Sequence, residues 1–313
     1  MKQLNNTDRG KLGIIFAYFL IYVVWGSTYY FIGVALKGLP PFLLGAFRFM
    51  IAGLLLLFLC WYRGESIFRK NLIKKSAVSG IVLLFIDMAV VMLAQRYVSS
   101  SLVAIIASST AIWITALDAP MWKRNFRNTA VISGIVIGFL GVLMLYLEQF
   151  CIEDYQHQGH REYGVLLLVF GCISWALGTL YAKYRSSGEE EVNAFAGSAW
   201  QMLFAGAMFW ICAFACGDVV NTDLSIVPVS SWLSLIYLIL FGSIMAYSAY
   251  VWLLKIRPAT EVATHAYVNP FVAVFIGVTL GKEHVTWFQI VGLVIILLSV
   301  MLIQKKPKVH SSD

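Results

Sequence analysis

Charged residues are scarce in this sequence. Asp, Glu, Lys and Arg make up 12% of the 313 residues, whereas hydrophobic residues make up 60%. Soluble domains are roughly 25% charged and 45–50% apolar, so this composition excludes an ordinary water-soluble fold and indicates a lipid bilayer as the solvent. Long polar stretches are also lacking, which leaves no room for a separate soluble domain.

Motifs for metal, disulfide and nucleotide chemistry are missing as well. The five cysteines, Cys60, Cys151, Cys172, Cys212 and Cys216, include no CxxC pair. We therefore expect neither a disulfide framework nor a zinc site. The sequence also has no GxxxxGK[ST], GxSxG or HExxH motif. Direct use of ATP is therefore not indicated, and no cofactor, metal or hydrolase site is expected.

What the sequence does contain is a series of long apolar windows. A helix needs about 20 residues to cross the ~30 Å hydrocarbon core of a bilayer. Ten windows meet this requirement and predict an all-α membrane protein with ten transmembrane helices, at 14–34, 42–62, 76–95, 99–118, 130–147, 163–182, 194–216, 232–254, 260–281 and 286–303.

The basic residues indicate how the chain is oriented. If the ten spans alternate in direction, 18 of the 23 Lys and Arg residues lie on the side of both termini and 4 on the other. The positive-inside rule then places both termini in the cytoplasm, with short tails at 1–13 and 305–313 and an external linker at 148–162. The net charge of +7 follows these boundaries and forms no continuous face, so no nucleic-acid partner is expected.

The two halves of the sequence resemble each other. Residues 96–113, RYVSSSLVAIIASSTAIW, align without gaps on residues 255–272, KIRPATEVATHAYVNPFV, and Trp25 corresponds to Trp175. Each repeat, 14–147 and 163–304, holds five predicted spans, and an odd number forces the second copy to enter the membrane from the opposite side. Inverted repeats around a central cavity are typical of transporters that work by alternating access.

Several short motifs are similar to those of one family. WGSTY at 25–29, AFRF at 46–49, LFGSIMAYSAY at 240–250, AYVNP at 266–270 and GKE at 281–283 resemble the drug/metabolite transporter superfamily, specifically EamA-type permeases. The resemblance covers roughly residues 14–304. It implies ten helices, a central cavity, and export or exchange of small metabolites. Ser99 and Ala111 replace prolines that the second copy has at Pro258 and Pro270, which predicts that the fourth span is the straighter one.

The ninth predicted span carries a stripe of polar residues. Glu261, His265 and Asn269 are spaced i, i+4 and i+8 and would lie on one face of a helix. Pro270 removes the helical partner of the Ala266 carbonyl and, with Pro258, predicts a kinked helix beside this stripe. Glu261 and His265 are candidates for proton coupling, and Asn269 for substrate binding. The alternatives are an interfacial Glu261, a packed His265 and a purely structural kink.

Two charged residues lie deep in the second and third spans. Arg48 and Asp87 are predicted at similar depths, about 10 Å and 13 Å below the outer boundary at 1.5 Å per residue. Because a paired charge is far less costly in a membrane than two isolated charges, we expect an ion pair between them. The pair would be a structural clasp, or alternatively a gate or a proton-responsive switch.

Aromatic and hydroxyl side chains supply candidates for a substrate cavity. Trp and Tyr side chains away from the span ends combine an apolar body with a polar group, which suits an amphipathic ligand, although packing alone would also explain them. The hydroxyls at 108–110 correspond to residues 267–269 in the repeat and would either face the cavity or bond to helix carbonyls. The candidates are Trp25, Tyr29, Ser108, Ser109, Thr110, Trp113, Trp175, Trp200, Tyr247, Tyr250 and Tyr267.

These observations lead to one function and its alternatives. We expect a secondary transporter of the bacterial inner membrane, an exporter or exchanger of small organic metabolites such as amino acids or amphipathic compounds. Its partners would be the lipid bilayer and the substrate, and protons are a further candidate. Either a monomer or a homodimer fits the sequence. The alternatives are an intramembrane lipid-modifying enzyme, a passive channel and a sensor.

Overall fold

A computed structural model describes residues 6–148, 161–185, 194–257, 262 and 264–304, and within these ranges it contains helices and their connections but no strands. Eight helical segments are long and apolar enough to cross a membrane, and two further apolar helices, His265–Thr279 and Trp287–Ile303, are shorter. The predicted ten-helix membrane fold is therefore confirmed. Helices suit this environment because they satisfy every main-chain polar group within one segment.

The spans differ in how regular they are. The first five consist of α1–η1–α2 (Asn6–Phe19, Leu20–Val24, Trp25–Ala35), α3 (Pro41–Tyr62), α4–η2–α5 (Lys70–Ser79, Gly80–Ile86, Asp87–Ala94), α6–α7 (Ser100–Ala107, Thr110–Leu117) and α9 (Thr129–Glu148). The second five are α10 (Arg161–Arg185), α11 (Ala194–Ala215), α13–η4–α14 (Val229–Tyr237, Leu238–Tyr247, Ser248–Ile256), α16 (His265–Thr279) and α17 (Trp287–Gln304). Short helices η3 (Ala119–Met121), α8 (Trp122–Asn125) and α12 (Asp218–Asn221) lie in the connections.

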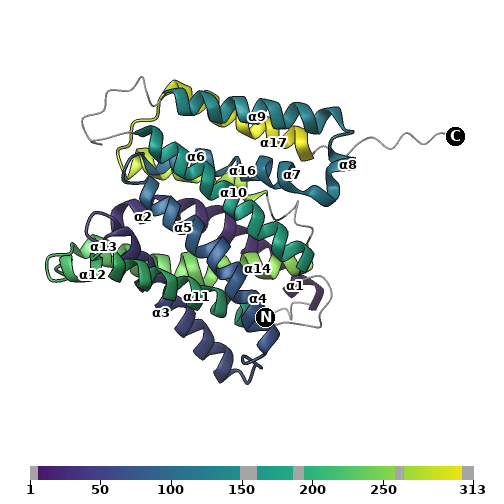
Figure 1. Ribbon diagram of the computed structural model, residues 1–313. Coiled ribbons are helices and arrows are strands. Elements are labelled where there is room, and N and C mark those ends of the chain that lie inside the picture. Colours follow the sequence, from purple (N-terminus) through teal and green to yellow (C-terminus); the bar gives the residue numbers. More distant parts are fainter. Residues whose placement is uncertain (1–5, 149–160, 186–193, 258–261, 263, 305–313) are drawn as a thin grey trace.

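The helices pack in pairs that relate the two halves of the chain. In Figure 1, α9 and α17 form a layer at one edge of the molecule, and α3 packs on α11 near the opposite edge. Between them, α10 contacts α5, α13 contacts α2, and α16 contacts α6. Exchanging each span for the one five positions along the chain leaves this set of pairs unchanged. A pseudo-twofold axis between inverted repeats would produce this arrangement.

Three helices contain π-helical segments. These segments are η1 in the first span, η2 in the third and η4 in the eighth. The third and eighth spans are counterparts in the predicted repeat, and both change from α to π and back to α. A π segment leaves main-chain carbonyls without their usual helical partners, so other side chains must satisfy them.

Each π segment receives hydrogen bonds from a side chain on another span. Trp25 Nε1 donates to the Gly242 carbonyl of η4 at 3.1 Å, and Ser174 Oγ donates to the Val82 carbonyl of η2 at 2.9 Å. The Asn269 amide nitrogen, in the orientation that satisfies its neighbours, donates to the carbonyls of Ile21 and Tyr22 in η1, both at 2.9 Å. The irregular helices are thus stabilised by tertiary contacts.

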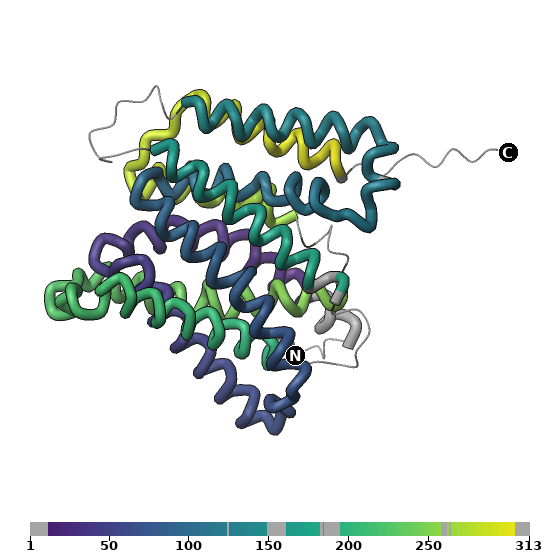
Figure 2. The backbone as a smooth tube through the Cα atoms, in the orientation of Figure 1, coloured from purple at the N-terminus to yellow at the C-terminus, as the bar shows by residue number. Residues whose placement is uncertain are grey.

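The two ends of the bundle differ in the residues that form them. We call the end formed by residues 63–69 and 118–128 the basic end, and the end formed by residues 36–40, 95–99, 217–228 and 280–286 the Glu283 end. Figure 2 shows that the chain alternates between these ends from one span to the next. By the positive-inside rule the basic end would face the cytoplasm.

The fourth span, predicted to be straighter than its counterpart, the ninth span, is interrupted. Its helix stops at Ala107 and resumes at Thr110. Ser108 Oγ donates to the Ile105 carbonyl at 2.6 Å, and Thr110 Oγ1 donates to the Ala107 carbonyl at 2.7 Å. Such back-bonding competes with the regular helical ladder and bends helices. In the second copy α16 continues through Pro270, whereas Pro258 lies outside the described residues.

Gly80 is placed where η2 crosses α11, and it provides the first test of this packing. A Cβ there would lie 2.4 Å from the main-chain oxygen of Gln201, whereas a Cβ at Gly13 would meet nothing within 4 Å. We expect Gly80→Ala to lower the free energy of unfolding by about 1–3 kcal/mol, because neither backbone can move aside easily. Gly13→Ala is the matched control and should be neutral or stabilising. Thermal unfolding of both variants in one detergent tests this, and equal midpoints would contradict the close crossing.

Candidate functional site

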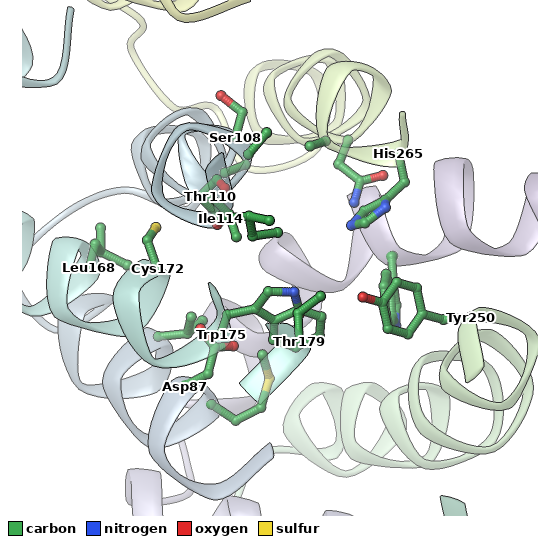
Figure 3. Close-up of a pocket in the computed structure, with 18 of the residues that line it drawn as sticks. Asp87, Ser108, Thr110, Ile114, Leu168, Cys172, Trp175, Thr179, Tyr250 and His265 are labelled. Atoms are coloured by element: carbon green, nitrogen blue, oxygen red, sulfur yellow. Dashed lines mark hydrogen bonds between the residues drawn. The ribbon is translucent and has the colours of Figure 1, made fainter. Parts of the chain in front are cut away.

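A central cavity of about 500 Å³ lies between the two halves of the chain. Most of its wall is formed by α2, α3, η2, α5, α6, α7, α10, η4, α14 and α16, with single residues from η3, α8, α9 and α17, so both predicted repeats contribute. Figure 3 shows Asp87, Cys172, Trp175 and Thr179 on one side of it, with His265 and Tyr250 on the other. This volume is in the range of about 300–1,000 Å³ that is usual for small-molecule sites.

The cavity is placed asymmetrically along the bundle. Toward the basic end it reaches the connecting residues Met121, Asn125 and Asn128. Toward the Glu283 end its wall stops at Ile32, which is 2% exposed, below the fully buried Leu39 and Leu102. Among the described residues, the cavity lining therefore reaches the connections at the basic end and stops below a packed layer at the other end.

Glu283 forms the main polar contact across the closed end. Its Oε1 accepts from Ser100 N at 3.2 Å and from Ser100 Oγ at 2.5 Å. Its Oε2 accepts from Ser101 N at 3.0 Å and from Ser101 Oγ at 2.5 Å. The carboxylate thus binds the free amides at the start of α6, where the helix dipole also favours negative charge. It joins the connection after α16 to the fourth span.

Glycine makes room for this contact. A Cβ at Gly277 would lie 2.4 Å from Ser101 Oγ and 2.6 Å from Glu283 Oε2. Sequence reasoning used GKE at 281–283 only as a family motif and missed the role of Glu283. A carboxylate in a connection, opposite a Ser-Ser helix start in the other repeat, was the available signal.

An aromatic cluster around Trp25 forms the cavity wall near the repeat interface. The Trp25 ring centroid lies 5.1 Å from that of Tyr250, 5.4 Å from His265 and 6.0 Å from Trp175. Its indole nitrogen is bonded to η4, which fixes the ring. Tyr247 also lines the cavity, and its hydroxyl donates to Gln201 Oε1 at 2.6 Å. This part of the cavity wall is therefore aromatic, and hydrogen bonds hold the Trp25 indole and the Tyr247 hydroxyl in place.

The polar stripe predicted in the ninth span is only partly described. Glu261 lies outside the described residues, whereas His265 and Asn269 both line the cavity. His265 Nδ1 is 2.9 Å from the Val262 carbonyl oxygen. Asn269 is 6% exposed and its amide nitrogen is bonded to η1. The amide nitrogen therefore has a structural role in addition to the predicted role of Asn269 in substrate binding.

The predicted ion pair between Arg48 and Asp87 is not formed. Both residues line the cavity, but no salt bridge joins them in the part of the chain that the structure describes. Arg48 Nε donates instead to Ser243 Oγ at 2.9 Å, and its guanidinium carbon lies 4.8 Å from the centroid of the Phe49 ring. Position along a helix does not fix the direction in which each side chain points.

Four predicted cavity residues lie elsewhere. Trp113 packs on Phe139 with centroids 4.8 Å apart, and Trp200 Nε1 donates to the Ile67 carbonyl at 2.9 Å at the basic end. Ser109 is fully buried and its Oγ lies 3.8 Å from Cys172 Sγ. Tyr267 packs against the core beside the cavity wall. The predicted residues that do line the cavity are Trp25, Tyr29, Ser108, Thr110, Trp175, Tyr247, Tyr250, Asn269, Arg48, Asp87, His265 and Pro270.

The described residues contain no group of three His, Cys, Asp or Glu side chains that could hold a metal ion. The polar side chains of the wall are spread over several helices and surround one largely apolar cavity. Such an arrangement suits reversible binding of an organic solute, with orientation set by a few polar contacts.

Asn269 allows structural and binding roles to be separated. Removing its amide removes the side-chain hydrogen bonds to the Ile21 and Tyr22 carbonyls within the membrane. Asn269→Ala should therefore lower the free energy of unfolding by about 1–3 kcal/mol. Ser108→Ala is the control, because this hydroxyl also lines the cavity but bonds only within its own helix. Thermal unfolding without ligand is the measurement, and an unchanged midpoint for Asn269→Ala would show that the amide does not stabilise η1.

Known proteins are similar to this chain in sequence and fold. A family model described as the EamA-like transporter family matches residues 11–147 and 162–304. The chain is 30% identical over 295 residues to the uncharacterized inner membrane transporter YedA of Escherichia coli (strain K12), covering 94% of this chain and 92% of that protein. It is 24% identical over 282 residues to the "Probable amino-acid metabolite efflux pump" of the same strain, covering 89% and 90% of the two chains.

A solved crystal structure also has the same fold. It superposes with a TM-score of 0.65 at 19% identity and covers 93% of this chain and 96% of that one. The two family matches correspond to the two halves that surround the cavity, and the relatives are named as transporters or efflux pumps of membranes. This chain is an integral membrane protein and belongs to the EamA-like transporter family.

Proposed function

We propose that this protein is a secondary transporter that exports or exchanges a small organic solute by alternating access. The observation that carries the proposal is a cavity between two related halves, whose lining reaches the connections at the basic end and stops below a packed layer at the Glu283 end. A site reached from one side only is what alternating access requires of each state. Because the basic end would face the cytoplasm, we take the described state to be inward-facing.

Transport in proteoliposomes tests this function. Saturable uptake of a solute, with stimulation by the same solute on the other side, is the expected result. Amino acids are the first class to test, because one relative is named as an efflux pump for amino-acid metabolites. Flux that does not saturate would support a channel instead, and chemical conversion of the solute would support an enzyme.

The source of energy can be tested in the same vesicles. Asp87 and His265 are titratable side chains on the cavity wall, so they are candidates for carrying a proton in exchange for the solute. Proton exchange predicts that a pH gradient drives solute accumulation. Facilitated diffusion predicts that a pH gradient changes nothing, in which case neither side chain couples transport to protons.

In this proposal the Glu283 contact holds the external side closed. The carboxylate receives four hydrogen bonds from Ser100 and Ser101, and each hydrogen bond to a charged group contributes about 1.5–3 kcal/mol. An outward-facing state would have to separate α6 from the connection after α16. The contact would therefore favour the inward-facing state.

Glu283→Ala should shift the population toward the outward-facing state by about tenfold or more, given the bonds that are lost. The measurement is labelling of an Ile32→Cys variant, free of native cysteines, by a membrane-impermeant maleimide added from the Glu283 side. Labelling should become faster, and labelling of Asn125→Cys from the basic side should become slower. Asp223→Ala removes an exposed carboxylate at the same end and is the control. Unchanged rates would contradict a closing role for Glu283.

A further inference from the structure

Asp87 is a buried carboxylate to which the proposed transport cycle assigns no fixed partner. It begins α5 directly after η2, is 8% exposed and lines the central cavity. Among the described residues no hydrogen bond or salt bridge is made to its side chain, whereas Arg48 is bonded to Ser243. A carboxylate in such a place is costly unless a proton or a cation compensates its charge.

The carboxylate has an apolar and aromatic environment. Its Oδ1 lies 3.3 Å from the position that a Cβ would take at Gly171, so it rests against the backbone of α10. Trp175 lies four residues beyond Gly171, hence on the same face of α10, and also lines the cavity. Figure 3 shows Trp175 beside Asp87, and the Trp175 ring centroid lies 5.8 Å from that of Tyr250.

This combination of groups matches one class of ligand. A protonated amine would supply the missing positive charge and a charge-assisted hydrogen bond. Aromatic faces attract cations and also cover the apolar part of an amphipathic molecule. An organic anion would meet the reverse situation, because it would face the Asp87 carboxylate.

We infer that Asp87 binds the ammonium group of the substrate, and that the substrate is an amphipathic amine whose apolar part lies against the aromatic cluster of Trp175 and Tyr250. The inference rests on the proposed transport function and specifies the substrate class of the same cavity. Arg48 is held by Ser243 and Phe49 in the wall and is not needed for amine binding.

Binding to purified protein tests this assignment with three matched probes. They are 2-phenylethylamine, the neutral 2-phenylethanol and the anionic 3-phenylpropanoate, each measured by equilibrium dialysis and by the shift in thermal unfolding. The amine should bind more tightly than the other two. Asp87→Asn should weaken amine binding by about ten- to hundredfold, the effect of losing a hydrogen bond to a charged group, and leave 2-phenylethanol binding unchanged.

Two controls keep the result interpretable. Asp223→Asn makes the same chemical change at an exposed position outside the cavity and should bind the amine like the wild type. Asp87→Glu keeps the charge and should retain part of the amine binding, whereas unchanged 2-phenylethanol binding by Asp87→Asn excludes misfolding as the cause of its loss.

Three outcomes would overturn the inference. These are equal amine binding by the wild type and Asp87→Asn, tighter binding of the acid than of the amine, and no binding of the amine to the wild type. None of them refutes the proposed function, because transport of a neutral or acidic solute would leave that intact. The proposed function would fail instead if solutes bind the cavity yet none crosses the membrane of proteoliposomes.

Discussion

Satisfaction of main-chain hydrogen bonds within the bilayer is the constraint on which this structure depends. A regular helix meets the constraint alone. Three of the described spans contain π segments, where a main-chain carbonyl can lack its usual helical partner. Each is satisfied by a polar side chain from a different span: Trp25, Ser174 and Asn269. Two of these donors, Trp25 and Asn269, also line the cavity. The residues that build the site are therefore partly the residues that stabilise its irregular walls.

The same constraint explains where polar groups in the membrane are compensated and where they are not. Ser108 and Thr110 bond to carbonyls of their own span, and Arg48 is bonded to a hydroxyl and lies over a ring. These groups have hydrogen-bond partners within the protein. Asp87 differs because the described part of the chain offers it no such partner. Uncompensated charge is a more informative sign of ligand chemistry than the number of polar residues on a wall.

The sequence predicted the parts of the structure that depend on composition and order. Apolar windows gave the ten helices, and the repeated pattern anticipated a cavity lined by both halves. Arg48 and Asp87 both line the cavity, but the directions of their side chains were not predictable, because rotation about the helix axis depends on π segments that no residue pattern predicts. The prediction of an ion pair was therefore wrong.

Other differences have equally local causes. Trp113 and Trp200 were judged by their distance from the span ends, but their indoles pack against Phe139 and beside Ile67. Glu283 was missed because its partners are 182 and 183 residues away in the chain. This contact joins a connection of one repeat to the start of a helix in the other. Tertiary packing decides which carboxylate meets which helix start.

The bond from Asn269 to η1 has a consequence for how the protein is made. Spans are synthesised and inserted from the N-terminus, so the carbonyls of Ile21 and Tyr22 enter the membrane long before their donor exists. Until the ninth span is inserted, the first half of the chain lacks these two side-chain hydrogen bonds. The contact that joins η1 to the second half therefore forms only near the end of synthesis.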